Sequence, residues 1–381
     1  MHLVDTTLFF SPTSGGVKRY LTAKHHWLKR HTAHRHSILV PGDAHRLTPG
    51  GISTIAGMRL PGTFNYRLPL SPHKWRVMLE ELEPDLIEVG DAFHPAWCAA
   101  NVARRRGIPL IAFFHSNLAQ LLGRRFGAGI ERAVARYVHS VYDQFDLVLA
   151  PSRAMCGYLA RLGVARTALQ PLGVDTEIFS PLRRTLNLRR VLELPDDARL
   201  LVYAGRFSEE KNLEVLHTAM ALLGKPYHLL LVGGGRRAQP AENIHVLPYR
   251  RDSVELAQWL ASADALVHAG SSETFGLVII EAMACGRPVV GVRAGAVPEL
   301  VDARTGELAE PDNAPSMVRA IRRLYDRNLE ALGAAARQRV LQRYTWSHSL
   351  GIELANYASV FAGTRAMPSV SAAMEFGSPG S

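Results

Sequence analysis

Residues 200–212 read LLVYAGRFSEEKN, and this stretch decides the fold class. An apolar run ends at Gly205 and a charged loop follows, as at the end of a short parallel strand covered on both faces. Further apolar runs recur at intervals that leave room for a helix, at residues 228–233, 244–247, 265–268 and 288–292. This alternation predicts a parallel sheet with helices on its faces.

A second series of the same kind lies in the first half of the chain, at residues 36–41, 85–90, 108–114 and 146–150. Two α/β domains suit a length of 381 residues, because one domain takes roughly 150. Residues 172–181 contain Gly and Pro and few helix signals, so we expect a linker there. We therefore divide the chain into domains 1–171 and 172–346.

The segment after the second domain predicts one more helix. Thr345 and Ser347 are good helix caps, and the helix is expected over about residues 347–362. Residues 363–381 are small, polar and poorly patterned, so we expect a disordered tail.

The composition is that of a globular protein, with 47% hydrophobic and 20% charged residues. Three widely spaced cysteines form neither a disulfide framework nor a metal-binding knuckle, which suits a reducing cytosol: Cys98, Cys156 and Cys285. No basic segment precedes the first apolar run, and no stretch approaches the roughly 18 apolar residues of a spanning helix. We expect a chain that is neither secreted nor transmembrane.

The net charge of +10 is concentrated in the first half of the chain. Residues 1–180 hold 21 Lys and Arg against 13 Asp and Glu, a balance of +8. Such a surface attracts nucleic acid, an acidic membrane or a phosphorylated substrate, and charge alone does not choose among them. Residues 124–138 mix basic and apolar side chains, as in either a membrane-surface helix or an ordinary amphipathic packing helix.

Residues 271–288 hold two glutamates around an expected helix. The helix should begin near Phe275 or Gly276 and end at about Gly286, with Glu273 before it and Glu281 within it. Unpaired backbone N–H groups at its start would bind an anion: those of Phe275, Gly276 and Leu277. A carboxylate on each side suggests a ligand with hydroxyls at both ends and phosphates between. From the spacing alone, a capping Glu273 and a solvated Glu281 are an equal alternative.

Three other positions suggest ligand contacts. Arg206 and Lys211 follow a predicted strand and could hold a diphosphate, although basic loop residues are usually solvated. Gly15 and Gly16 would let the backbone approach a ligand closely, which is weak evidence by itself. His115 ends a buried strand, where a lone histidine is more often structural than catalytic.

Taken in order, these motifs resemble those of the family 4 glycosyltransferases, retaining enzymes of the GT-B architecture, up to about residue 362. The shared features are a glycine-rich first loop, a mid-domain histidine, a linker, an Arg/Lys pair and two glutamates: residues 14–17, His115, residues 173–179, Arg206 with Lys211, and Glu273 with Glu281. The resemblance implies two facing Rossmann-like domains, with the C-terminal helix returning to the first. It also implies that the first domain binds the acceptor and the second the nucleotide sugar.

The resemblance also assigns roles. Arg206 and Lys211 would clamp the diphosphate. Glu281 would bind the ribose hydroxyls, and Glu273 would bind the transferred sugar. His115 would contact the sugar across the cleft. Residues 246–252, including Tyr249 and Arg250, fall where the family holds the base. Further donor contacts are implied along the backbone, at Gly15, Gly16, Phe275, Gly276 and Leu277.

These roles predict a retaining transfer of a hexose, mannose or glucose, from a UDP- or GDP-sugar to a lipid-linked or cell-envelope glycan. Retention in this family is described as attack on the face that the diphosphate leaves, without a protein nucleophile. We find no carboxylate pair suited to double displacement. We expect no cofactor and no metal, because Arg206, Lys211 and a helix N-terminus meet the phosphate charge and no Asp-x-Asp pair occurs.

Other interpretations stay open at this stage. An NDP-sugar epimerase or a polysaccharide synthase could use the same architecture. A nucleic-acid-binding protein is favoured only by the basic charge, because helix-turn-helix, zinc and RNP signatures are lacking, and we expect no nucleic acid partner. We expect a cytoplasmic enzyme, peripheral on an anionic inner membrane face, that acts in glycolipid or cell-envelope synthesis.

Overall fold

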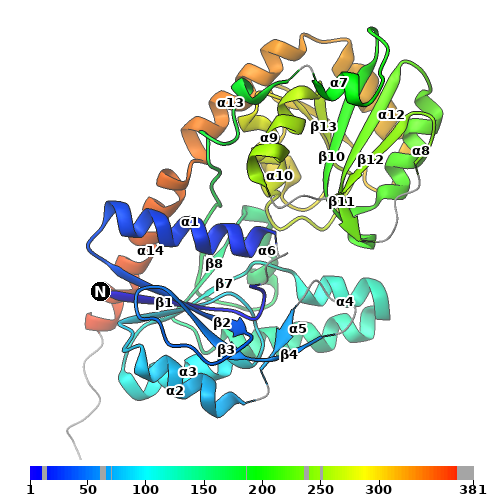
Figure 1. Ribbon diagram of the computed structural model, residues 1–381. Coiled ribbons are helices and arrows are strands. Elements are labelled where there is room, and N and C mark those ends of the chain that lie inside the picture. Colours follow the sequence, from blue (N-terminus) through cyan, green and yellow to red (C-terminus); the bar gives the residue numbers. More distant parts are fainter. Residues whose placement is uncertain are drawn as a thin grey trace, which may run out of the picture.

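The computed structural model describes residues 1–10, 15–60, 66–69, 71–185, 187–235, 240–248 and 252–366 (Figure 1). Within them the chain forms two parallel sheets, each flanked by helices, which confirms the predicted fold class. The first sheet has the strand order β3 (Ile52–Ala56), β2 (Arg35–Gly42), β1 (His2–Thr6), β6 (Leu86–Val89), β7 (Leu110–Phe113), β8 (Leu147–Ala150) and β9 (Thr167–Leu169).

The second sheet has the strand order β12 (Ile244–Pro248), β11 (Tyr227–Gly235), β10 (Arg199–Phe207), β13 (Ala265–Val267), β14 (Val289–Val292) and β15 (Gly306–Ala309). All nine apolar runs singled out in the sequence are strands of these sheets. The sequence analysis missed the edge strands β3, β9 and β15. A separate antiparallel pair consists of β4 (Met58–Arg59) and β5 (Arg67–Leu68).

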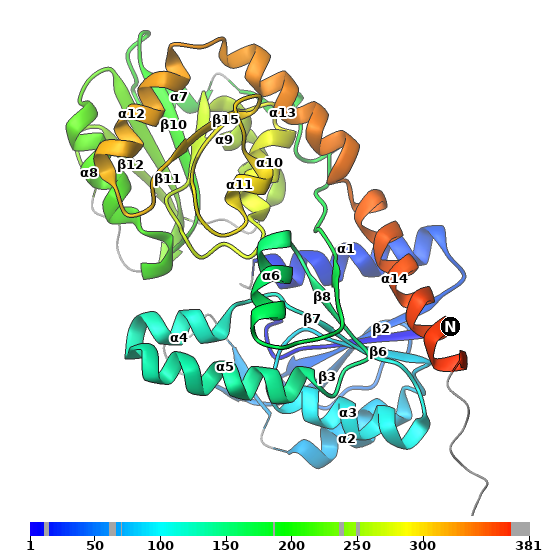
Figure 2. The same ribbon diagram turned by 180° about the vertical axis from the view of Figure 1, so that it is seen from behind.

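Helices cover both faces of the first sheet (Figures 1 and 2). The face toward the second domain carries α1 (Gly16–His31) and α14 (Trp346–Ala366), and the opposite face carries α2 (Pro72–Glu81) and α3 (His94–Arg106). The remaining helices of this half are α4 (Leu118–Phe126), α5 (Ala128–Tyr142) and α6 (Arg153–Arg161). Residues 124–138, treated above as one stretch, are divided between α4 and α5, because Gly127 has a φ of +92° and ends α4.

The second sheet also lies between two helix layers. One layer holds α8 (Leu213–Leu223) and α12 (Ala314–Tyr325); the other holds α9 (Ser253–Ser262), α10 (Leu277–Ala284) and α13 (Leu329–Arg343). Shorter elements complete this half: η1 (Pro181–Arg183), α7 (Asn187–Val191), η2 (Glu209–Lys211) and α11 (Val297–Leu300). Within the described ranges, no helix is both long and apolar enough to cross a bilayer.

The last helix crosses back to the first domain, as the family resemblance implied. On α14 the Ser347 hydroxyl accepts a hydrogen bond of 3.0 Å from the Trp27 indole of α1. The helix extends from residue 346 to 366, beyond the expected 347–362. Of the expected disordered tail, residues 367–381 lie outside the described part of the chain, and the domain boundary at residue 171 stays a prediction.

A buried ion cluster joins α14 to the core of the first domain. The Lys24 ammonium lies 2.8 Å from Asp5, 2.7 Å from Glu353 and 3.2 Å from Glu88, and its side chain is 1% exposed. The Tyr357 hydroxyl accepts a further hydrogen bond of 2.7 Å from Lys24. Burial alone would lower the pKa of Lys24, but the three carboxylates raise it well above its usual value. We call these four charged residues the Lys24 cluster.

Each sheet has a point at which the chain switches from one direction of strand addition to the other. These switch points lie between β1 and β6 in the first sheet and between β10 and β13 in the second. Ligands of open α/β sheets bind beyond the carboxyl ends of the strands at such points. The candidate site is therefore expected where the loops after these four strands end.

Candidate active site

The first part of the site is an ion pair between the loops that follow β10 and β13. These strands are hydrogen-bonded neighbours, with Leu201 opposite Ala265. Their carboxyl ends therefore bring the next loops together, and the Lys211 ammonium donates to the Glu273 carboxylate. Two residues singled out separately in the sequence thus lie in direct contact at the switch point.

A third member of this site, His268, was missed by the sequence analysis. It directly follows β13, is buried, and places Nε2 at 2.9 Å from the same Glu273 oxygen that Lys211 contacts. Its ring stacks on Tyr203 of β10, with the planes 10° apart. The signal that could have found it is its position at a strand end beside the switch point. We call Lys211, Glu273 and His268 the Lys211 cluster.

Charge and backbone geometry both hold Glu273 in place. Burial alone would raise the pKa of this carboxyl, but Lys211 and His268 hold it well below its usual range. The backbone carbonyl of Glu273 accepts a hydrogen bond of 3.0 Å from the Ala296 N–H. A side chain at Gly295, whose φ is +57°, would meet that carbonyl at 2.6 Å. Glu273 is therefore an ionised carboxylate, and its loop can pack closely against residues 295–296 because position 295 is a glycine.

Arg206 lies near this cluster but does not join its ion pair. The sequence placed Arg206 after the strand; this was wrong, because β10 pairs with β11 as far as Phe207. Its side chain is 57% exposed, and its guanidinium lies 3.5 Å from the Glu210 carboxylate. Its charge also acts on the hydroxyl of Tyr66 in the first domain. Burial raises the pKa of Tyr66, and the positive charge of Arg206 opposes that rise. Arg206 thus faces the junction of the two domains.

The N-terminus of α10 lies against the N-terminal end of α1. The sequence predicted a helix start near Phe275 or Gly276, and α10 begins at Leu277 with Gly276 as its cap at a φ of +101°. A Cβ atom on Gly16, the first residue of α1, would lie 3.1 Å from the Leu277 side chain. The ring of Phe275 packs edge-on against Tyr344. The predicted anion-binding amides therefore lie beside the glycine-rich loop of the other domain.

Glu281 contacts the other domain through a residue that the sequence analysis did not single out. Its carboxylate is buried on α10 and accepts a hydrogen bond from the Arg19 guanidinium of α1. Burial raises the pKa of Glu281, and Arg19 opposes that shift. The solvated position that the spacing allowed is excluded, because the Glu281 side chain is only 3% exposed.

His115 completes the arrangement from the end of β7. Its imidazole stacks on Phe113 at a centroid distance of 4.2 Å. Its backbone carbonyl accepts a 2.9 Å hydrogen bond from the Thr274 hydroxyl of the second domain. Burial lowers the pKa of His115 to about 3, so the ring is neutral at physiological pH. Of the other predicted contacts, Gly15 directly precedes α1, whereas Tyr249 and Arg250 lie outside the described residues.

Comparison with known proteins places this geometry in a family. The family Glycosyltransferase Family 4 matches residues 14–178, and the family Glycosyl transferases group 1 matches residues 198–327. The first match covers the first sheet except β1, and the second match covers the whole second sheet. Gly15, Arg19 and His115 lie within the first match, and Arg206, Lys211, His268, Glu273 and Glu281 lie within the second.

Two similar proteins and two similar structures extend the comparison. A GDP-mannose-dependent alpha-(1-6)-phosphatidylinositol dimannoside mannosyltransferase of Mycobacterium tuberculosis is 30% identical over 96% of this chain and 98% of its own length. The sulfoquinovosyl transferase SQD2 of Arabidopsis thaliana is 28% identical over 78% of this chain and 61% of its own. Sucrose-phosphate synthase of Thermosynechococcus elongatus has a TM-score of 0.80 at 22% identity, covering 95% of this chain and 99% of its own. HepE of Anabaena with UDP and glucose has a TM-score of 0.74 at 20% identity, covering 94% and 99%.

Proposed function

The chain belongs to glycosyltransferase family 4, and we propose that it transfers mannose from GDP-mannose, with retention of configuration, to a hydroxyl group of a glycolipid. The donor and acceptor classes are suggested by the mycobacterial relative, whose similarity extends over nearly the whole of both chains. The observation that carries the proposal is the joining of Lys211, Glu273 and the α10 N-terminus at one switch point.

The donor diphosphate would lie between the Arg206 and Lys211 side chains and the amides of residues 275–277. Negative charge grows on the phosphates as the bond to the sugar breaks. Fixed cations and the positive end of a helix dipole stabilise that charge without further reorganisation.

Glu281 would accept hydrogen bonds from the two ribose hydroxyls of the donor. One of its oxygens accepts from Arg19, so a ligand that uses both oxygens must displace or share that guanidinium. Nucleotide binding is therefore expected to change a contact between the domains. Arg19 thereby couples the donor site to the first domain.

Glu273 and His115 would contact the transferred sugar from opposite sides of the domain junction. Glu273 is ionised and oriented by two neighbours, so it can accept hydrogen bonds from sugar hydroxyls. His115 is a neutral imidazole, so it is suited to hydrogen bonding rather than to donating a proton from an imidazolium. The departing phosphate would take the acceptor proton, and no protein nucleophile is required.

We further propose that the enzyme works on the surface of an anionic membrane. The hairpin of α4 and α5 exposes Phe126 and Ile130, whose side chains are 60% and 43% exposed. In the same hairpin, Arg125 directly precedes Phe126 and Arg132 lies two residues after Ile130. Exposed apolar side chains beside basic residues are typical of a surface that docks on lipid headgroups.

A transfer assay tests the enzymatic proposal. The purified protein is incubated with radiolabelled GDP-mannose and a mannosylated phosphatidylinositol acceptor, with UDP-glucose as the alternative donor and excess EDTA in a parallel reaction. We expect an alpha-linked mannosyl product from GDP-mannose, at the same rate with EDTA. Transfer from UDP-glucose alone would reject GDP-mannose as the donor. Loss of activity in EDTA with rescue by manganese would reject the metal-free diphosphate site.

A further inference from the structure

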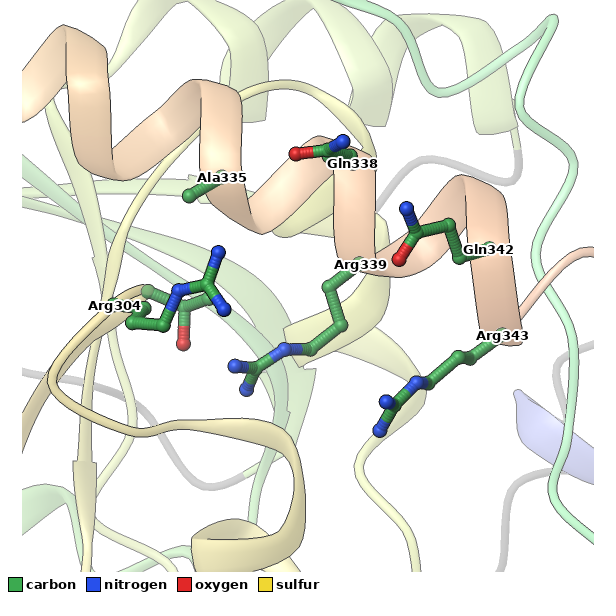
Figure 3. A pocket seen from close by; sticks show the side chains of 7 residues that line it. Arg304, Ala335, Gln338, Arg339, Gln342 and Arg343 are labelled. Carbon is green, nitrogen blue, oxygen red and sulfur yellow. The ribbon is translucent and has the colours of Figure 1, made fainter.

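A polar pocket lies beside α13 in the second domain (Figure 3). It has a volume of about 280 Å³ and shares no lining residue with the candidate active site. One wall is the last part of α13, and the other is the turn before β15. The lining is dominated by guanidinium and carboxamide groups: Arg304, Gln338, Arg339, Gln342 and Arg343.

The arginines converge because of helix geometry. Arg339 and Arg343 are four residues apart on α13 and so lie on the same face of the helix. Figure 3 shows both side chains extending from α13 toward the segment that carries Arg304. The backbone N–H of Arg304 donates 2.9 Å to Asp302, which forms the turn that presents its side chain.

The charges of this pocket are only partly balanced by the protein. Arg339 donates to the Asp302 carboxylate at 2.5 Å and to the Leu300 carbonyl at 2.9 Å, so it has a structural role. Over the described residues, neither the Arg304 nor the Arg343 guanidinium has a carboxylate within ion-pair distance. Two exposed guanidinium groups at the rim of this pocket are therefore without an ion-pair partner in the described part of the chain.

We propose that this pocket binds a phosphate group, carried either by a small soluble phosphate ester or by the headgroup of an anionic lipid. Guanidinium groups present paired N–H donors that match phosphate oxygens, and the carboxamides of Gln338 and Gln342 add neutral donors. The volume is just below the roughly 300 Å³ at which pockets for larger organic ligands begin. The site therefore suits a phosphate group rather than a whole nucleotide sugar.

The pocket also adjoins the segment in which the chain passes from the second domain back to the first. Arg343 is the last residue of α13, and the next residue, Tyr344, accepts a 2.8 Å hydrogen bond from the Val174 N–H of the linker. The ring of Tyr344 in turn contacts Phe275 at the start of α10, at a centroid distance of 5.8 Å. A ligand bound to Arg343 is thus connected to the proposed donor site through Tyr344 and Phe275.

The test uses the full-length protein and two double variants. R304A/R343A removes the two unbalanced cations and keeps Arg339. R319A/R322A removes the same charge from exposed positions on α12 and is the matched control. Melting temperature is measured against sodium phosphate, with sodium chloride at equal ionic strength as the reference. Since both variants keep the donor site, any difference between them reports on the pocket.

We expect R304A/R343A to bind phosphate about tenfold more weakly for each guanidinium removed, and R319A/R322A to behave as the parent does. Sedimentation with vesicles containing phosphatidic acid, against phosphatidylcholine vesicles, separates the two sources. Loss of vesicle binding in R304A/R343A identifies a lipid headgroup, and unchanged vesicle binding with lost phosphate binding identifies a soluble ester. If both variants match the parent in both measurements, the pocket does not bind phosphate and the proposal is wrong.

Discussion

Two lysines of this protein are held by carboxylates, in different surroundings. Lys24 lies in the core of the first domain, 1% exposed, between Asp5, Glu88 and Glu353. Lys211 lies at the carboxyl end of the second sheet, is 19% exposed, and contacts one carboxylate. The Lys24 cluster is complete without a ligand and joins three distant parts of the chain. The Lys211 cluster leaves donors and acceptors at a loop edge, where a substrate can use them.

The comparison predicts that replacing Lys24 lowers stability, whereas replacing Lys211 lowers turnover. K24M would leave the buried carboxyl groups of Asp5, Glu88 and Glu353 without their shared cation, which typically costs about 3–5 kcal/mol of folding free energy. Chemical denaturation should show this loss, with kcat of the remaining folded protein near that of the parent. K29M, on the exposed side of the same helix, is the control and should stay within ±0.5 kcal/mol. A K24M protein as stable as K29M would mean that the cluster does not support the fold.

K211A should show the opposite pattern. Losing one preorganised group that meets charge in the transition state costs about 2.7–4 kcal/mol, or roughly 10²–10³ in turnover. R206A should fall in the same range, because it presents the second cation of the proposed clamp. K225A, an exposed lysine of the same domain, should keep the parent's kcat. Turnover of K211A or R206A within about threefold of the parent would place the diphosphate elsewhere.

The Lys24 cluster should also make stability depend on pH. Burial, with Asp5 and Glu353 nearby, raises the pKa of Glu88 to about 8, against the opposing effect of Lys24. A carboxyl whose pKa is higher in the folded state stabilises the fold while protonated, and that stability is lost as pH rises toward 8. The parent should therefore lose up to about 1.4 kcal/mol per pH unit from this group between pH 6 and 8. In E88Q, the free energy of unfolding measured by denaturation at several pH values should no longer fall in this way. The same pH dependence in both proteins would contradict the shifted pKa.

The contact between Arg19 and Glu281 should have a smaller effect. Arg19 is 28% exposed, and partly exposed ion pairs contribute roughly 0–1 kcal/mol. Removing Arg19 also takes away the cation that opposes the burial-driven rise in the pKa of Glu281, so this pKa should rise further in R19M. R19M should therefore bind GDP more weakly at pH 6 than at pH 8.5, with a steeper change than the parent. Calorimetry at the two pH values measures this, and parallel profiles would show that Arg19 does not control Glu281.

The fold was predictable because most strands of the two sheets are apolar throughout. Runs such as residues 228–233 are covered by helices on both sides, and this burial is visible in the sequence. Three of the four edge strands of these sheets, β3, β9 and β15, escaped because they are short and partly polar, as in Thr167–Leu169. The strand end at Arg206 was misplaced because pairing with β11 extends β10 past Gly205, and no local signal marks that pairing.

The site was predictable where its residues are close in sequence to a strand end or a helix start. Glu273 and Lys211 could be singled out in this way, and the packing of β10 against β13 then explains why they meet. Arg19 could not be found, because its contact with Glu281 depends on how two domains pack across 262 positions of sequence. His268 was overlooked because a single histidine after a strand has no distinctive spacing.

The most direct test of the proposed donor site compares two glutamates by calorimetry with GDP. Glu281 is expected to hold the nucleotide and Glu273 the sugar, which GDP lacks. E281A should lose a charge-assisted contact of roughly 1.5–3 kcal/mol, which weakens GDP binding by about 10- to 150-fold. E273A should bind GDP nearly as the parent does while its turnover falls. Equal losses of GDP affinity in both variants would contradict this division of roles.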